Sequence, residues 1–200
     1  MYIGFKRVLD VTLSLMLLVI LSPVFAIVAL VIHLDSDGPI IFRQVRSGRL
    51  GHPFVIYKFR TMLTAAPANI ATAQLEQPQR YITPVGRFLR QTSLDELPQL
   101  FNVLKGDMSF VGPRPVIPSE TYLLSLRRRY GAHTVRPGIT GLAQIRGRDE
   151  LPPRLKAQYD AEYAANCTFL LDGYIFFSTL RYVIRREGIR EGSADLYRKP

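Results

Sequence analysis

Residues 11–32 read VTLSLMLLVILSPVFAIVALVI, a run of 22 positions without a charged side chain. As one straight α-helix this run would be about 33 Å long, which matches a hydrocarbon core of about 30 Å. A secretory signal peptide has a shorter apolar region of about 7–15 residues and ends in a small-residue cleavage site. Here Asp35 and Asp37 follow instead. The sequence therefore predicts a retained membrane element.

The topology of this element depends on its centre and its flanks. Pro23, after Ser22, removes a backbone hydrogen bond and kinks a helix. Basic residues lie on both sides of the run: Lys6, Arg7, Arg43, Arg46 and Arg49. A crossing helix would place one basic group on the non-cytoplasmic side, against the positive-inside tendency, whereas a re-entrant helix keeps both on one side. From these residues alone, the re-entrant helix and a kinked crossing helix remain equally open.

Composition narrows the class of protein. The chain has 200 residues, 48% apolar and 21% charged, which suits one globular domain or a small domain with an appendage. A single cysteine, Cys167, excludes an internal disulfide framework, and three histidines without metal-ligand spacing argue against structural zinc. The net charge of +10 predicts an anionic partner: nucleic acid, a membrane surface or a phosphate-rich substrate.

The rest of the chain predicts an α/β fold, mostly helical, with a small β-sheet. Strands are expected over 39–45 and 54–59, on either side of a glycine-rich turn, with a surface loop over 63–80. Thr83 and Pro84 open a short helix to residue 90. Ser93 and Glu96 match a capping box, which predicts a helix from 93 to 104 that ends at Gly106. Further helices are expected near 119–130, 153–166 and 172–187, with rigid loops at 111–115 and 136–141.

The last of these helices reads DGYIFFSTLRYVIRRE at 172–187. It places apolar residues on one side (Ile175, Phe176, Leu180, Val183, Ile184) and arginines elsewhere (Arg181, Arg185, Arg186). An aromatic and basic amphipathic helix is typical of a membrane interface. A helix packed on the protein's own core shows the same pattern, so both interpretations stay open.

Adjacent acids such as Asp95 and Glu96 usually mark a solvated helix start, where they favour the helix dipole. Here they occur in a chain with cations on short elements or rigid turns: Lys58, Arg60, Arg87, Arg90 and Arg114. Carboxylates among cations can hold Mg²⁺ and act on a phosphorylated substrate, and Asp95 can attack phosphorus directly.

Arg114 lies between Pro113 and Pro115, which restrict the backbone on both sides. A guanidinium presented in this way binds phosphate oxygens at little entropic cost, although a plain surface turn explains the tripeptide equally well. The glycine loop at 138–141 offers backbone N–H groups to an anion only as a weak signal.

Taken together, these motifs resemble those of the bacterial sugar transferases, the monotopic phosphoglycosyl transferases that act on a polyprenyl phosphate. The matching stretches run from residue 5 to about 187: FKRVLD at 5–10, SP at 22–23, GPIIFRQ at 38–44, KFRTM at 58–62, SLDELPQ at 93–99, NVLKGDMS at 102–109, VGPRP at 111–115, RPGITGLAQ at 136–144, and Asp160 with Tyr163. Without a further N-terminal membrane domain in the sequence, the minimal form of the family is expected.

The resemblance implies a reaction in which a nucleotide diphosphate sugar, usually UDP-linked, gives its sugar-1-phosphate to polyprenyl (undecaprenyl) phosphate and releases UMP. It implies that Asp95 is the nucleophile, with Glu96 as partner carboxylate, and that both are candidate ligands of the required Mg²⁺. It also implies residues that bind phosphate or line the site: Lys58, Arg60, Arg90, Arg114, Gln144 and Asp160. Arg146 departs from the family, because many members have a small polar residue there.

The resemblance further implies a re-entrant membrane helix over residues 1–36, bent at Ser22 and Pro23, and a catalytic domain over 37–200 with interfacial helices. The expected location is the cytoplasmic face of the bacterial inner membrane, in contact with membrane lipid, and a second copy of the chain is an open partner. The alternative is a non-catalytic membrane-bound module that binds anionic lipid or a partner glycosyltransferase. No nucleic acid is expected, since no reading motif accompanies the positive charge.

Overall fold

The computed structural model describes residues 2–67, 75, 77–147 and 151–185, without the side chains of the last three. It begins with two long helices, α1 (Tyr2–Ile20) and α2 (Ser22–Asp35), which are bent by 62° at their junction. Pro23 has no N–H for the carbonyl of Val19, and the Ser22 hydroxyl donates to that carbonyl instead at 2.8 Å. The predicted break at Ser22 and Pro23 is therefore confirmed, and the serine satisfies the acceptor that the proline leaves.

The apolar residues of α1 lie mostly on the outside. Its buried side chains are Asp10 and Ser14. Its exposed ones include Ile3, Phe5, Val8, Leu13, Leu15, Met16, Val19 and Ile20. In the described residues neither α1 nor α2 is by itself long and apolar enough to cross a membrane. By length and composition alone, the two bent helices together are. This distribution is the reverse of that in a helix of a water-soluble domain.

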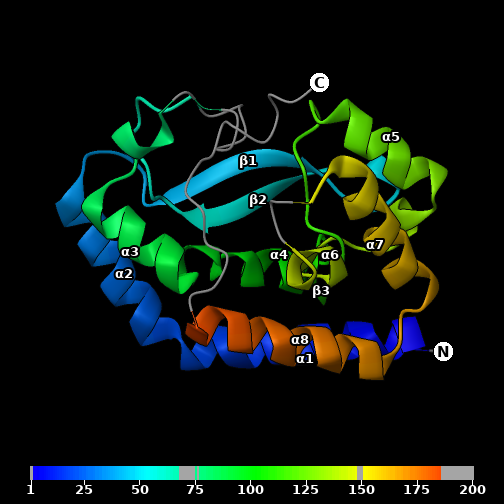
Figure 1. Cartoon of the computed structure of the whole chain (residues 1–200). Helices are drawn as coiled ribbons and strands as arrows, with labels where there is room; N and C mark the ends of the chain where they lie inside the picture. Colours follow the sequence, from blue (N-terminus) through cyan, green and yellow to red (C-terminus); the bar gives the residue numbers. More distant parts are fainter. Residues whose placement is uncertain (1, 68–74, 76, 148–150, 186–200) are drawn as a thin grey trace.

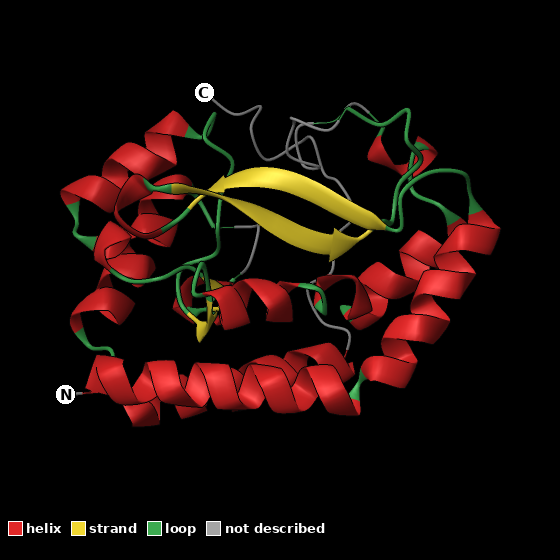
Figure 2. Ribbon diagram, turned by 180° about the vertical axis from the view of Figure 1, so that it is seen from behind, coloured by secondary structure: helices red, strands yellow, loops and turns green. Residues whose placement is uncertain are grey.

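A β-hairpin lies at the centre of the domain (Figure 1). Strands β1 (Ile41–Ser47) and β2 (Pro53–Phe59) pair antiparallel from Ile41 opposite Phe59 to Ser47 opposite Pro53, joined by the 3₁₀ turn η1 (Arg49–Gly51). The two strands are where the sequence predicts them, within two residues at each end. The hairpin has α2 and α3 toward one end and α5 and α7 toward the other, and the same arrangement is seen from behind (Figure 2).

The segment after the hairpin corrects one prediction. Helix α3 (Pro84–Thr92) begins as expected, because the Thr83 hydroxyl accepts from the N–H of Gly86 at 2.9 Å. The expected single helix over 93–104 is wrong: a 3₁₀ turn, η4 (Leu94–Glu96), precedes α4 (Gln99–Lys105). Ser93 has a φ of 57° and caps no helix through its side chain, so there is no capping box. Gly106, with a φ of 96°, ends α4 as predicted.

A second, parallel pair of strands lies where the sequence predicts rigid loops. β3 (Ser109–Val111) pairs with β4 (Gly138–Thr140). Glycines allow the two backbones to meet, since a Cβ on Gly138 would lie 2.1 Å from the nitrogen of Gly112. The Gly138 N–H donates to the Pro113 carbonyl at 3.0 Å. The N–H of Gly138 is thus used within the fold. It is not offered to an anion, as the glycine loop at 138–141 had weakly indicated.

The remaining elements complete a mostly helical fold, as the sequence predicts, with two small sheets in place of the one expected. They are η3 (Pro78–Arg80), α5 (Thr121–Arg129), η5 (Ala132–Thr134), α6 (Leu142–Ile145), α7 (Pro153–Ala165) and α8 (Phe169–Arg185). Thus the three C-terminal helices expected near 119–130, 153–166 and 172–187 are present. The core is divided into small clusters between these elements, for example Val28, Ile32, Phe59 and Leu89 between α2, β2 and α3.

Helix α8 is joined to α1 by polar contacts at its first turn. Asp172 accepts hydrogen bonds from the Tyr2 hydroxyl at 2.5 Å and from the Tyr163 hydroxyl at 2.7 Å, and it pairs with Lys6. Ile175 is buried in the core, as expected for a helix that packs on the protein's own core. The same helix also has exposed apolar side chains, as expected for an interfacial helix: Phe169, Leu170, Tyr174, Phe176, Phe177 and Leu180. The side chains of Val183, Ile184 and Arg185, and all of Arg186, lie outside the described residues.

Asn102 joins α4 to the free edge of β2. Its Oδ1 accepts from the N–H of Tyr57 at 3.0 Å, and its Nδ2 donates to the carbonyl of Val55 at 2.7 Å. The side chain is fully buried. A single amide therefore replaces the neighbouring strand that this edge lacks.

We predict that Asn102→Leu lowers the free energy of unfolding by about 2–4 kcal/mol, because a buried N–H and a buried carbonyl lose their partner. The measurement is chemical or thermal unfolding in a neutral detergent. Asn166→Leu is the matched control: Asn166 is exposed and its Nδ2 donates to Glu162 in its own helix, so a change within about 0.5 kcal/mol is expected. Equal losses in the two variants would contradict the assignment.

Candidate active site

The two adjacent carboxylates lie on the single turn η4, between α3 and α4. Asp95 is buried, with 9% of its surface exposed. Glu96 accepts from Lys58 on β2, whose Nζ lies 2.7 Å from Oε1, and from both terminal nitrogens of Arg114 at 3.3 Å. A strand, a turn and the loop after β3 thus bring two cations to one carboxylate oxygen. The solvated helix start is excluded for this pair.

The two carboxylates differ in how they titrate. Burial alone would raise the pKa of Glu96, but Lys58 and Arg114 outweigh it and lower that pKa to about 2. Burial raises the pKa of Asp95 above its usual value; Lys58 opposes this shift and the negative charge of Glu96 adds to it. Glu96 is therefore a fixed negative charge at neutral pH, while Asp95 is the carboxylate that gains a proton more readily.

Arg90 approaches the pair from the last turn of α3. Its Nε donates to the Thr61 hydroxyl at 2.9 Å, and its Nη2 lies 3.5 Å from the sulfur of Met62. Its charge lowers the pKa of Asp95. Of the residues predicted for the site, the structure therefore brings together Asp95, Glu96, Lys58, Arg90 and Arg114.

Asp160 contacts this cluster indirectly, through Arg127. It is 1% exposed and binds Arg127 through contacts of 2.7 Å to Nε and 2.6 Å to Nη2. Arg127 in turn donates to the backbone carbonyl of Arg114 at 2.9 Å. Asp160 is thus a positioning residue and does not reach the carboxylate pair. Sequence reasoning missed Arg127, because a member of the run Arg127–Arg129 looks like part of a solvated face.

Two other predicted residues serve the fold. Arg60 is buried and donates to the carbonyls of Ser36 and Asp37, which follow the C-terminal end of α2. Gln144 donates to the carbonyl of Ile139 at 2.9 Å. These contacts are to backbone carbonyls of the fold, and the part of Arg60 and Gln144 in phosphate binding stays a prediction.

The donor set suits a metal ion held largely by its substrate. In the described part of the chain, no group of three or more acidic, histidine or cysteine side chains could hold a metal. Mg²⁺ is commonly bound through one or two carboxylates with substrate phosphates and water. Asp95 and the Glu96 oxygen that does not bind Lys58 and Arg114 fit that role.

Comparison with known proteins gives the family of the chain. The model of the bacterial sugar transferase family matches residues 1–186. The chain belongs to this family. A relative from Bacillus subtilis (strain 168), described as an uncharacterized sugar transferase, EpsL, is 41% identical over 186 residues, covering 93% of this chain and 90% of the relative.

Two longer members carry a described activity. The UDP-glucose:undecaprenyl-phosphate glucose-1-phosphate transferase of Escherichia coli (strain K12) is 42% identical over 88% of this chain. The undecaprenyl-phosphate galactose phosphotransferase of Salmonella typhimurium is 40% identical over 92% of it. The match spans 39% and 41% of the length of these two transferases.

The lowered pKa of Glu96 predicts a pH-dependent difference in stability. Ionised Glu96 stabilises the folded state above its ordinary pKa of 4.5, and this contribution is lost as the pH falls through about 2. Glu96→Gln should therefore cost about 3 kcal/mol at pH 7. The cost should shrink steadily below pH 4.5.

The measurement is the unfolding free energy of both proteins at several pH values. Glu162→Gln on α7 is the control, because Glu162 is exposed and the removal of its charge should change little at any pH. A cost of Glu96→Gln that stayed constant from pH 7 to pH 2 would refute the ion-pair assignment.

Proposed function

We propose that the chain is a phosphoglycosyl transferase that moves a sugar-1-phosphate from a UDP-sugar to polyprenyl phosphate, giving a polyprenyl diphosphate sugar and UMP. The observation that carries this proposal is that two adjacent carboxylates, the buried Asp95 and the partly buried Glu96, have different electrostatic surroundings. Glu96 is neutralised by Lys58 and Arg114, while Asp95 lies beside it on η4, the turn that follows Ser93. Membership of the family and the activities described for its relatives support the same reaction.

In the first step, an ionised Asp95 oxygen attacks the phosphorus that carries the sugar. The bond from this phosphorus to the oxygen of the departing UMP breaks, and a phosphosugar ester of Asp95 forms. In the second step, a phosphate oxygen of polyprenyl phosphate attacks the same phosphorus, and Asp95 leaves as the free carboxylate. Each step exchanges one P–O bond for another, as covalent catalysis by a carboxylate requires.

The cations around the pair stabilise the charge of the transferred phosphoryl group. The Arg114 side chain is 43% exposed, so its guanidinium both contacts Glu96 and faces the surface from which a diphosphate arrives. Arg127 and Asp160 hold its backbone in place. Mg²⁺, when bound by Asp95, Glu96 and substrate oxygens, supplies further neutralisation of the diphosphate.

The exposed apolar residues of α1 and α2 support a place at the membrane. We infer that the bent pair enters the bilayer and returns to the same face, with the catalytic domain on the cytoplasmic side of the bacterial inner membrane. A polyprenyl phosphate holds its phosphate at the depth of the headgroups, while a UDP-sugar is soluble. A site beside a re-entrant helix meets both substrates.

We predict that Asp95→Asn abolishes UMP release, because the amide is a poor nucleophile, while the protein stays folded and membrane-bound. The assay contains purified protein, Mg²⁺, undecaprenyl phosphate and a panel of UDP-sugars that includes glucose, galactose and N-acetylgalactosamine. Asp37→Asn is the control, since Asp37 is exposed and Arg60 contacts its backbone carbonyl. A fully active Asp95→Asn variant would exclude the covalent mechanism.

The re-entrant topology predicts that both ends of the bent pair face the cytoplasm. In a Cys167→Ser background, single cysteines at Tyr2 and Leu50 should both be protected from an impermeant thiol reagent in intact cells and react after lysis. A cysteine in an established periplasmic loop of another membrane protein is the positive control. Labelling of one position but not the other in intact cells would restore a crossing helix.

A further inference from the structure

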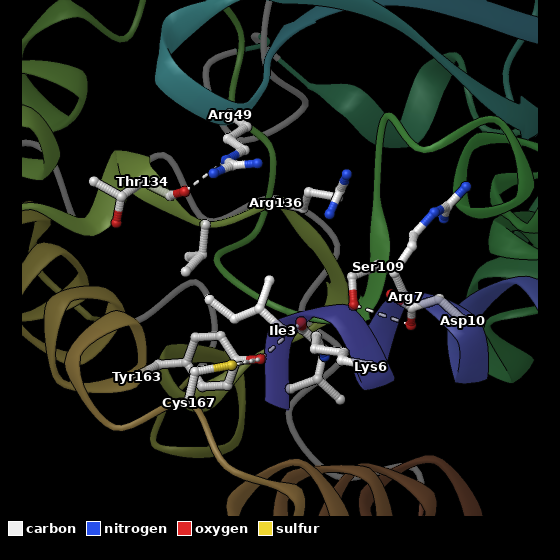
Figure 3. A pocket seen from close by; sticks show the side chains of 12 residues that line it. Ile3, Lys6, Arg7, Asp10, Arg49, Ser109, Thr134, Arg136, Tyr163 and Cys167 are labelled. Atoms are coloured by element: carbon white, nitrogen blue, oxygen red, sulfur yellow. Dashed lines mark hydrogen bonds between the residues drawn. The ribbon is translucent and has the colours of Figure 1, made fainter. Parts of the chain in front are cut away.

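A second cluster of cations surrounds a pocket between the start of α1, η5 and the β3–β4 sheet, which we call the basic pocket (Figure 3). Its charged lining residues are Lys6, Arg7, Asp10, Arg49 and Arg136. Arg49 and Arg136 lie on one side of it, with Ile3 and Lys6 on the other. None of its lining residues belongs to the Asp95 cluster.

The guanidiniums of this pocket bind uncharged partners. Arg7 donates to the carbonyls of Val103 and Leu104 at 2.6 and 2.8 Å. Arg136 donates to the carbonyl of Gly106 at 2.9 Å, and Arg49 to that of Thr134 at 2.8 Å. Backbone carbonyls orient these groups without cancelling their charge.

The acidic side chains near the pocket do not balance this charge. Lys6 is paired with Asp172, so the three arginines face a single lining carboxylate, Asp10. Asp10 already accepts from the Ser109 hydroxyl at 3.1 Å and from the N–H of Phe110 at 3.2 Å. Burial lowers the pKa of Arg136, and repulsion from the charges of Arg7 and Arg49 adds to this shift. An anion in the pocket would relieve this repulsion.

The pocket also borders the exposed apolar surface of the protein. Ile3 lines the pocket and is 56% exposed. Cys167, another lining residue, lies two residues before the start of α8, whose first residues Phe169 and Leu170 are 60% and 83% exposed. A ligand with a phosphate at one end and an apolar chain at the other fits this border better than a free ion.

We propose that the basic pocket binds the phosphate group of an anionic membrane phospholipid, whose acyl chains lie along the exposed apolar residues at the starts of α1 and α8. Arginines suit this role, because a guanidinium donates two parallel hydrogen bonds to phosphate oxygens. The bound lipid links α1, η5 and the C-terminal end of α4, and so fixes the catalytic domain at the height of the headgroups. The inference does not depend on the proposed transferase reaction.

The test measures lipid binding to the purified chain in a neutral detergent, where no charged surface attracts the protein. Native mass spectrometry follows a titration with phosphatidylglycerol, and with phosphatidylcholine as the zwitterionic comparison. Arg49→Glu is the informative variant, since Arg49 is exposed and donates to the carbonyl of Thr134, whereas Arg7 and Arg136 hold the end of α4. Arg181→Glu on α8 is the matched control, with the same change in charge on an exposed arginine.

We expect Arg49→Glu to weaken phosphatidylglycerol binding about tenfold and Arg181→Glu less than twofold, with Arg49→Lys between them. Melting temperatures of the variants confirm that each is folded. Equal weakening by the two charge reversals, or equal binding of the two lipids, would overturn the site. Inorganic phosphate is the last arm: if it binds as tightly as phosphatidylglycerol, the phosphate site stands and its assignment to a lipid is overturned.

Discussion

Two adjacent carboxylates cannot be buried together without positive charge nearby, and much of this domain follows from that constraint. Asp95 and Glu96 share one turn, so their mutual repulsion is built into the sequence. Lys58 and Arg114 offset it, which requires β2 and the loop after β3 to meet at that turn. Arg114 in turn depends on Arg127, and Arg127 on the buried Asp160. The charge balance of one turn therefore determines how the hairpin, η4, α5 and α7 are arranged.

Helix α1 shows a complementary constraint, which acts on the polar groups that it buries against the domain. Its buried residues are polar, and each is satisfied: Asp10 by Ser109 and Phe110, and Ser14 by the carbonyl of Val11. Polar groups must find partners wherever water is absent. The apolar side chains on its outer face are the ones that the proposed membrane location would place against lipid. The same helix thus has buried polar groups toward the domain and exposed apolar groups away from it.

The sequence predicted the hairpin, the break at Ser22 and Pro23, and most helices, because proline, glycine and apolar runs act locally. The predicted capping box at Ser93 was wrong, because this residue has left-handed backbone angles and its side chain caps no helix. The β3–β4 sheet was also missed, since strands of three residues show no alternation and their glycines indicate turns. Asp95, Glu96, Lys58, Arg90 and Arg114 could be named from charge and resemblance. The roles of Arg127 and Asp160 could not, because they depend on contacts between distant segments.

The two clusters of cations described above differ in the groups that bind them. Around Asp95 and Glu96, Lys58 and Arg114 bind a carboxylate of the protein itself, so their charge is balanced within the site and Glu96 stays ionised at neutral pH. In the basic pocket, Arg7, Arg49 and Arg136 are oriented by backbone carbonyls, which leave their charge in place. A balanced cluster suits chemistry, in which charge must develop and disperse within the site. An unbalanced cluster suits binding, because the ligand itself supplies the missing charge.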